Sequence, residues 1–183
     1  MPAPSPLNTP LITIYDKPDC KGALMEVVGP MYDLAVRGFR KVPSVMVTRG
    51  VWVLYQECNL GGNIYVVWEG QTVNLPEFCT VSLKPIEVDF TEKPEMIVYT
   101  EPSFTGQKKT FKTAVANLAG INFHDNISSV KVESGAWVAY RDVNYQGPQY
   151  LFTRGAFNGT SSEGHFQNNA ISSLKPIALS YPC

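Results

Sequence analysis

The chain of 183 residues has few of the features that mark membrane, metal-thiolate or nucleic-acid-binding proteins. It has two histidines and no CxxC pair among its four cysteines, so zinc-site spacing is absent. Fifteen Lys and Arg residues stand against 16 Asp and Glu residues, which leaves a net charge of −1 and no basic excess of the kind that nucleic-acid binding needs. No apolar run approaches the roughly 20 residues of a membrane-spanning helix. We therefore expect no nucleic-acid partner and no transmembrane segment.

Motifs of catalysis are also missing. No glycine-rich phosphate loop and no EF-hand loop occurs in the chain. His124 and His165 each lie beside a turn, and no nucleophile or carboxylate can be assigned to either of them, which favours a solvated or turn-capping role. The sequence predicts no catalytic residue and no enzyme.

The amino-terminal residues and the cysteines bear on the compartment. Residues 1–10 include four prolines and lack the charged and apolar regions of a signal peptide, so they predict a flexible tail. The cysteines are sparse for a disulfide framework, which favours reduced thiols. We expect a soluble, cytoplasmic protein, with secretion as an open alternative. The cysteines are Cys20, Cys58, Cys79 and Cys183.

What the chain does contain is an internal duplication. The segment Gly50-Val-Trp-Val-Leu-Tyr55 returns as Gly135-Ala-Trp-Val-Ala-Tyr140, an offset of 85 residues. Ser82-Leu-Lys-Pro-Ile86 returns as Ser173-Leu-Lys-Pro-Ile177, an offset of 91 residues. The difference falls in a Gly/Ser/Asn-rich stretch, where an insertion into a loop costs little. Such self-similarity predicts two related domains.

Each half divides again into two copies of a shorter pattern: an aromatic residue, four residues, a bulky residue, one residue and a glycine. The copies begin at Tyr15, Tyr55, Tyr99 and Tyr140, so their starts are 40, 44 and 41 residues apart. A glycine at a fixed place after an aromatic-bearing hairpin indicates a positive φ or a close backbone approach. These glycines are Gly22, Gly62, Gly106 and Gly147.

Short runs of β-branched and aromatic residues, separated by turn-forming residues, predict an all-β fold of Greek-key sandwiches. Helical periodicity nowhere extends beyond a turn or two, as near residues 114–118. We expect a first domain at residues 11–88, a linker at 89–95 and a second domain at 96–179. The expected strands cover residues 11–15, 52–55, 64–68, 96–99, 130–132 and 137–140.

This fourfold pattern resembles the βγ-crystallin superfamily, in which a serine further along each motif pins the aromatic hairpin over the sheet. The resemblance implies two tandem βγ-crystallin-type Greek-key β-sandwich domains, in a family that is not catalytic. Cys20 and Leu60 stand where the second aromatic is usual, so the first half departs more from the pattern. In style the chain is similar to non-lens members. The four pinning serines would be Ser44, Ser82, Ser129 and Ser173.

Many superfamily members bind calcium at a loop of the form Asn/Asp-Asn/Asp-x-x-Ser/Thr-Ser. Residues 168–173 match it fully, and residues 124–129 match it except for His124. The resemblance therefore implies two Ca²⁺ sites in the second domain, built from oxygen ligands. It assigns side-chain oxygens to Asp125 and Asn169, hydroxyls to Ser128 and Ser172, backbone carbonyls to Asn126 and Ala170, and carbonyls that complete the opposite site to Thr100 and Arg141.

The first domain lacks this ligand set. Its first loop has Arg40 in place of the acidic ligand and Pro43 in place of the hydroxyl, while its second loop has Phe78 and Val81 there. We expect no calcium in that half. The Asn- and Ser-rich loops of the second half also make good turns by side-chain to backbone hydrogen bonds, without any metal. With one carboxylate across both sites, the expected affinity is micromolar or weaker.

Three functional hypotheses remain open. The first is a calcium-stabilised structural or interaction protein, with self-association or another protein as partner. The second is a calcium-independent structural crystallin of the lens type. The third is a module that partners a membrane-acting protein.

Overall fold

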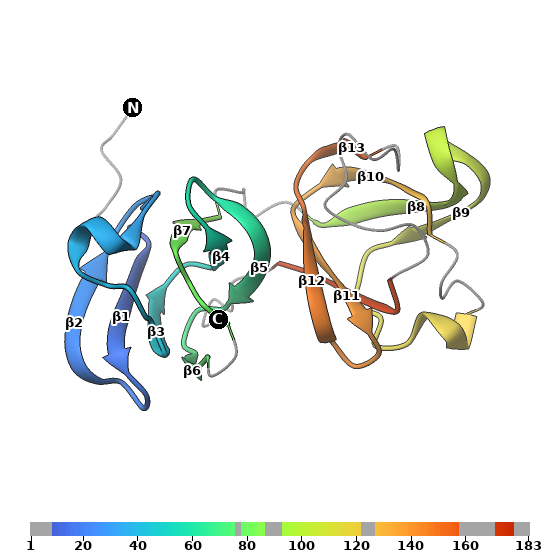
Figure 1. Ribbon diagram of the computed structural model, residues 1–183. Coiled ribbons are helices and arrows are strands. Elements are labelled where there is room, and N and C mark those ends of the chain that lie inside the picture. Colours follow the sequence, from blue (N-terminus) through green and yellow to red (C-terminus); the bar gives the residue numbers. More distant parts are fainter. Residues whose placement is uncertain (1–8, 76–77, 87–92, 122–126, 158–170, 178–183) are drawn as a thin grey trace. The chain divides into compact units, whose positions relative to one another are not determined.

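The computed structural model describes residues 9–75, 78–86, 93–121, 127–157 and 171–177. The described residues form two compact units, unit 1 within residues 9–86 and unit 2 within residues 93–177. Both units consist almost entirely of antiparallel strands (Figure 1). Among the described residues, no helix has the length and apolar character needed to cross a membrane.

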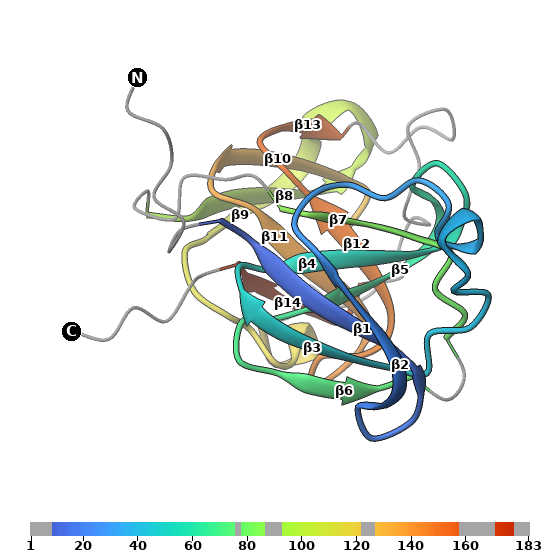
Figure 2. The ribbon, with the colours of Figure 1, turned by 90° about the vertical axis from the view of Figure 1, so that its left-hand side faces the viewer.

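Unit 1 is a sandwich of two sheets, and its first sheet faces the viewer in Figure 2. The strands of the first sheet, in the order β2-β1-β3-β6, are β1 (Leu11–Lys17), β2 (Lys21–Val27), β3 (Ser44–Arg49) and β6 (Thr72–Asn74). The second sheet has the order β5-β4-β7, with β4 (Trp52–Glu57), β5 (Gly61–Val67) and β7 (Ser82–Pro85). A short 3₁₀ helix, η2 (Leu34–Arg37), precedes β3.

Each sheet of unit 1 contains one segment from the other sequence motif. β6 comes from the second motif but pairs with β3 of the first, with Val45 opposite Val73. In return, Met31 of the first motif forms reciprocal backbone hydrogen bonds of 2.9 Å with Leu83 of β7. This exchange makes the two motifs one folding unit, since neither completes a sheet alone.

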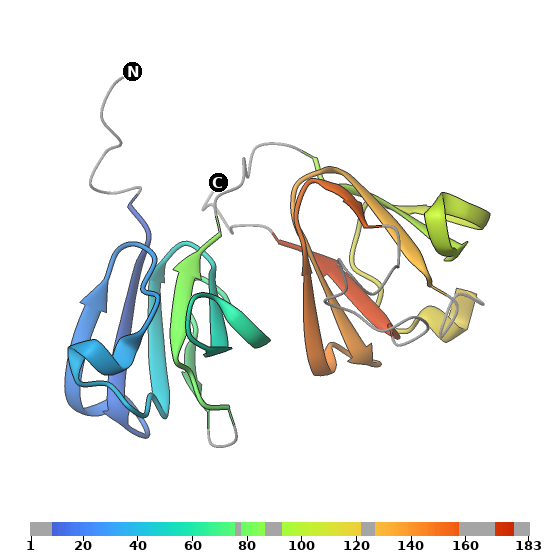
Figure 3. The same ribbon diagram turned by 45° about the horizontal axis from the view of Figure 1, so that its top comes forward.

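Unit 2 repeats the arrangement, and the layers can be followed in Figure 3. Its first sheet, in the order β13-β10-β8-β9, contains β8 (Glu95–Glu101), β9 (Thr105–Phe111), β10 (Ser129–Ser134) and β13 (Gly155–Phe157). Its second sheet contains β14 (Ser173–Pro176), β11 (Trp137–Asp142) and β12 (Gln146–Phe152), in that order. Val115 bridges to Leu174 as Met31 does to Leu83. Two 3₁₀ helices, η3 (Pro102–Phe104) and η4 (Leu118–Ile121), lie in the connections.

A separate apolar core fills each sandwich because alternate strand residues point inward. In unit 1, Ile12 and Ile14 of β1 face Trp52 and Leu54 of β4, and all four side chains are fully buried. In unit 2 the equivalent position to Trp52 is Trp137, also fully buried. The hydrophobic effect on these inward rows holds the two layers together.

The all-β, Greek-key fold predicted from the repeats is confirmed, and strands cover every segment expected to form one except Trp68, which lies just beyond the end of β5. The observed strands are longer by one to three residues at several ends, because cross-strand pairing continues past the apolar stretch. The expected linker ended at residue 95, whereas β8 begins at Glu95, which pairs with Ser134. Residues 87–92 lie outside the described part of the chain.

Candidate functional site

The same folded hairpin occurs four times, once after the first strand of each motif. In the fourth motif Asn144 and Tyr145 both have positive φ, at 58° and 60°, and Gly147 follows at 79°. Positive φ is costly for residues with a side chain, so such a pair persists only where the surroundings enforce it. The corresponding pairs in the other motifs are Asp19 and Cys20, Asn59 and Leu60, and Ser103 and Phe104.

A buried serine holds each hairpin in this conformation. The hydroxyl of Ser173 donates a hydrogen bond of 2.6 Å to the carbonyl of Asp142 and accepts one of 3.0 Å from the backbone N–H of Tyr145. Each of the four serines is fully buried and makes the same pair of bonds. The other three link Ser44 to Lys17 and Cys20, Ser82 to Glu57 and Leu60, and Ser129 to Glu101 and Phe104.

In unit 2 each hairpin also forms an aromatic and cationic cluster. The rings of Tyr140 and Tyr145 meet edge to face with centroids 5.7 Å apart, and the Lys175 ammonium lies 5.1 Å from the Tyr145 centroid. Burial lowers the pKa of Lys175. Cation–π attraction of this kind adds to the serine bonds.

The third motif has the same cluster, with the Lys131 ammonium 4.6 Å from the Phe104 ring centroid. The sequence reasoning missed both lysines. Their signal was present: each stands two residues after the pinning serine, and period-two alternation places it on the serine's face of the strand. In the first motif Met46 takes this position, beside a hairpin that has Cys20 instead of a second aromatic.

The candidate calcium loops enter the strands directly before these serines. The backbone N–H of Ser128 donates to the Tyr99 carbonyl at 2.9 Å, and that of Ser172 donates to the Tyr140 carbonyl at 2.9 Å. Ser128 is only 5% exposed. Among the described residues, neither serine hydroxyl has a hydrogen-bond partner.

The structure places Thr100 and Arg141 one residue beyond those two tyrosines, at the ends of β8 and β11. The Thr100 hydroxyl accepts the backbone N–H of Gln107 at 2.9 Å, and the Arg141 side chain is exposed. The role of their carbonyls in completing the opposite sites stays a prediction. The remaining predicted ligands, Asp125, Asn126, Asn169 and Ala170, lie outside the described residues.

The equivalent positions in unit 1 offer different chemistry. Pro43 has neither a hydroxyl nor an N–H, and the N–H of Val81 donates to the Tyr55 carbonyl at 2.8 Å without an accompanying hydroxyl. Arg40 is exposed, and Phe78 packs its ring against Tyr65 with centroids 5.7 Å apart. A cation would meet a like charge at the first loop and hydrocarbon at the second.

Two buried polar groups in unit 1 belong to no site. The Thr80 hydroxyl is buried and has no hydrogen-bond partner, at a position where the other motifs carry Val42, Ile127 and Ile171. Burial raises the pKa of Tyr55 above its usual value of 10.0.

Within the described part of the chain, no group of three or more His, Cys, Asp or Glu side chains could hold a metal.

Comparison with known proteins places this architecture among described families. The family model for Beta/Gamma crystallin matches residues 11–86 and 95–177. The chain is 34% identical to Beta-crystallin B2 of Oryctolagus cuniculus over 169 residues, covering 88% of this chain and 82% of the relative, and 33% identical to Beta-crystallin B2 of Homo sapiens over the same length and shares. Among solved structures, a βγ-crystallin from an Archaea is 35% identical over 47% of this chain and all of its own, with a TM-score of 0.43.

Proposed function

Because the chain belongs to the beta/gamma crystallin family, we propose that it is a structural protein without catalytic activity whose second domain binds Ca²⁺ weakly. The first domain binds none. Both Ca²⁺ ions are held in the two loops of the second domain that contain Asp125 and Asn169.

The observation that supports the proposal is the pair of serine hydroxyls in unit 2 that form no hydrogen bond with other described residues. Ser128 is 5% exposed and follows Asp125 and Asn126 closely in the sequence, so its hydroxyl can act with them as a ligand. Hydroxyl, amide, carbonyl and carboxylate oxygens are the ligands that Ca²⁺ takes. The residues that the loops provide therefore fit this ion, whereas Pro43 and Val81 at the same places in unit 1 do not.

The role of the bound ion is stabilisation. A ligand that binds only the folded state adds RT ln(1 + [L]/Kd) to the free energy of unfolding, about 2.7 kcal/mol at a hundredfold excess over Kd. With one carboxylate shared between two sites, we expect Kd in the micromolar range or weaker. Calcium would thus protect unit 2 only where its concentration is high.

Isothermal titration of the full chain with CaCl₂ tests the proposal, together with thermal melts in Ca²⁺ and in chelator. We expect two sites and an upward shift of one unfolding transition. Changing both Asp125 and Asn169 to Ala should abolish the heat and the shift. Glu133→Ala, which removes an exposed carboxylate from β10 of the same unit, is the matched control and should change neither.

Variants of the neighbouring residues Ser172 and Ser173 distinguish an effect on Ca²⁺ binding from an effect on folding. Ser172→Ala should weaken Ca²⁺ binding and leave the melting temperature in chelator nearly unchanged, because its hydroxyl holds no hydrogen bond among the described residues. Ser173→Ala should lower that melting temperature, because two hairpin bonds are lost. No binding heat at millimolar Ca²⁺, or full binding by the Asp125 and Asn169 double variant, would refute the proposal.

A second candidate is a calcium-independent structural crystallin of the lens type. The observation in its favour is the 34% identity to Beta-crystallin B2 across most of both chains. In that case the melting temperature would be high and the same in Ca²⁺ and in chelator, and the calcium titration would show no heat of binding.

A further inference from the structure

Among the described residues, the exposed apolar side chains are concentrated in the first motif. Five of the six large hydrophobic residues that are exposed in this part of the chain fall between residues 24 and 46. Val36 is 75% exposed, the highest value among them, while Val28 and Tyr32 are 59% and 54% exposed. The remaining three are Leu24, Met46 and, in unit 2, Val143.

The most exposed of these residues lies on a rigid turn, here named the cationic tip and comprising residues 34–41. The Asp33 carboxylate caps the turn by accepting the Ala35 N–H at 3.0 Å. Gly38, with φ of 87°, ends it and donates its N–H to the Ala35 carbonyl at 3.0 Å.

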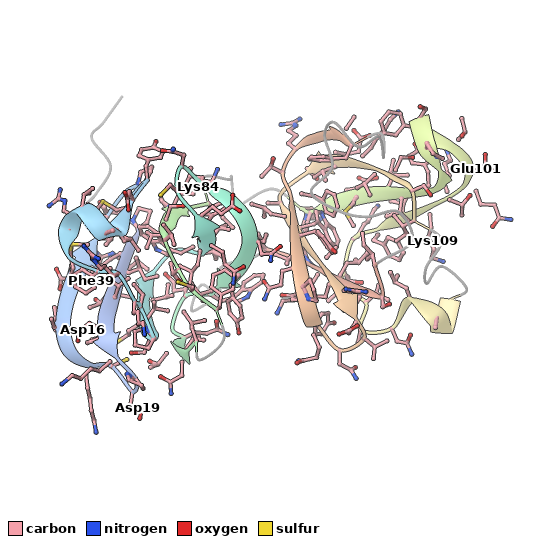
Figure 4. All side chains as sticks on the ribbon, in the orientation of Figure 1. Asp16, Asp19, Phe39, Lys84, Glu101 and Lys109 are labelled. Atoms are coloured by element: carbon pink, nitrogen blue, oxygen red, sulfur yellow. The ribbon has the colours of Figure 1, made fainter. Side chains whose placement is uncertain are left out.

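Buried residues at both ends anchor the cationic tip to the core of unit 1. Leu34 is fully buried and Phe39 is 9% exposed (Phe39 is labelled in Figure 4). Val36 and Arg37 lie between these anchors and therefore project from the surface. Their exposure follows from the construction of the turn.

Three cations lie near the exposed valine in the chain, and Asp33, which caps the turn, is the acidic residue next to them. Arg37, Arg40 and Lys41 are all exposed, and residues 34–41 contain no acidic side chain. The whole chain has a net charge of −1, so this cationic character is local. An apolar side chain at a projecting turn, flanked by three cations, combines the two interactions that hold a protein at a membrane surface: apolar burial and attraction to anionic lipids.

The equivalent turn of unit 2 shows that the fold does not require these residues. Asn117 caps η4 through the Ala119 N–H at 2.9 Å, as Asp33 caps η2. Gly120 stands at the position of Val36, and the sequence of residues 118–125, which corresponds to 34–41, contains no Lys or Arg. The same turn thus forms with neither the valine nor the cations.

We propose that the cationic tip attaches the protein to an anionic lipid surface, with Val36 entering the headgroup region and Arg37, Arg40 and Lys41 facing lipid phosphates and carboxylates. A projecting tip suits a lipid surface because lipid closes around a convex shape. An acidic protein would satisfy the cations but would leave Val36 in water unless it supplied a matching pocket.

Cosedimentation of the full chain with vesicles tests the proposal. The vesicles contain phosphatidylcholine alone or with added phosphatidylserine. We expect binding only to the anionic vesicles, weakening as salt screens the cations. Replacing all three cations by Gln should reduce binding about a hundredfold, at about fivefold per cation. Val36→Ser should reduce it several-fold at unchanged charge.

The matched control removes the same charge elsewhere. Lys108, Lys109 and Lys112 are exposed on or next to the edge strand β9, where lysines discourage pairing with other chains (Lys109 is labelled in Figure 4). Their triple Gln variant should bind anionic vesicles as the parent chain does. Circular dichroism checks the folding of every variant.

Four outcomes would overturn the proposal. Three of them are absence of vesicle binding at low salt, equal losses for the two triple variants, and binding to polyglutamate in place of vesicles. An unaffected Val36→Ser variant would also overturn it, because binding would then depend on charge alone.

Discussion

At the scale of single residues, small chemical differences between equivalent positions decide what each motif does. Ser128 and Ser172 bring a hydroxyl to positions where unit 1 has Pro43 and Val81. Each of the four residues stands directly before a pinning serine. They differ in whether their side chain can bind a cation. This is the scale at which the calcium proposal stands.

Thr80 gives a prediction at this scale. Its hydroxyl is buried without a hydrogen-bond partner, at a position that is Val or Ile in the other motifs. Thr80→Val keeps the volume and removes the desolvated hydroxyl, so we expect unit 1 to gain about 1 kcal/mol. Urea unfolding followed by Trp fluorescence measures it.

The control introduces the same defect in unit 2. Ile171→Thr should be less stable than Ile171→Val, because the two variants differ only by a buried hydroxyl in place of a methyl group. A Thr80→Val variant of lower stability than the parent chain would mean that the hydroxyl has a partner in solution.

At the scale of the element, the hairpin is the repeated unit and its glycine is its most constrained residue. Gly147 has φ of 79°, and a Cβ atom added there would lie 2.4 Å from Oδ2 of Asp142. Positive φ and steric exclusion thus act together. The spacing of the four glycines had indicated such a position from the sequence alone.

Gly147→Ala should therefore destabilise unit 2 by about 1–3 kcal/mol, because the hairpin must either accept a strained φ or move the Asp142 side chain. Gly120→Ala in η4 is the control, since an added Cβ there meets nothing within 4 Å. Thermal melts of both variants compare the costs. Equal melting temperatures for the Gly147→Ala and Gly120→Ala variants would contradict this prediction.

At the scale of the whole molecule, each unit has its own core and its own exchange of strands between motifs. The stability of unit 1 should therefore respond to changes that leave unit 2 unaffected. Tyr55, buried in unit 1 with a raised pKa, provides a pH-dependent example.

The unfolded chain ionises Tyr55 near its usual pKa of 10.0, whereas the folded unit keeps the phenol protonated to higher pH. The unfolded state thus binds fewer protons above pH 10, and the stability of unit 1 falls as pH rises through that range. Tyr55→Phe should lessen this fall. Denaturant unfolding of the parent chain and the variant, at pH 7 and above pH 10, measures this fall in stability. The difference between the two proteins at pH 7 gives the effect of the lost packing, which is subtracted. An identical pH dependence in parent and variant would refute the prediction.

Much of the fold was predictable because its signals are local and repeated. The Gly-x-Trp-x-x-Tyr segments at 50 and 135 and the Ser-Leu-Lys-Pro-Ile segments at 82 and 173 each reappear as one strand in equivalent places. The candidate site was predicted only through resemblance. Part of it can be located in the structure, at Thr100, Ser128, Arg141 and Ser172, and its calcium ligation stays a prediction.

The sequence by itself determined the all-β class, the duplication and the places of glycine and serine, because these depend on spacing along one hairpin or strand. The tertiary structure alone decided which sheet Val73 and Met31 join, that the Thr80 hydroxyl is buried without a partner, and that the core of unit 1 buries Leu34 and Phe39 on either side of Val36. Each of these depends on contacts between residues far apart in the chain. No local pattern encodes such contacts, because Val and Thr occur at buried and at exposed positions alike.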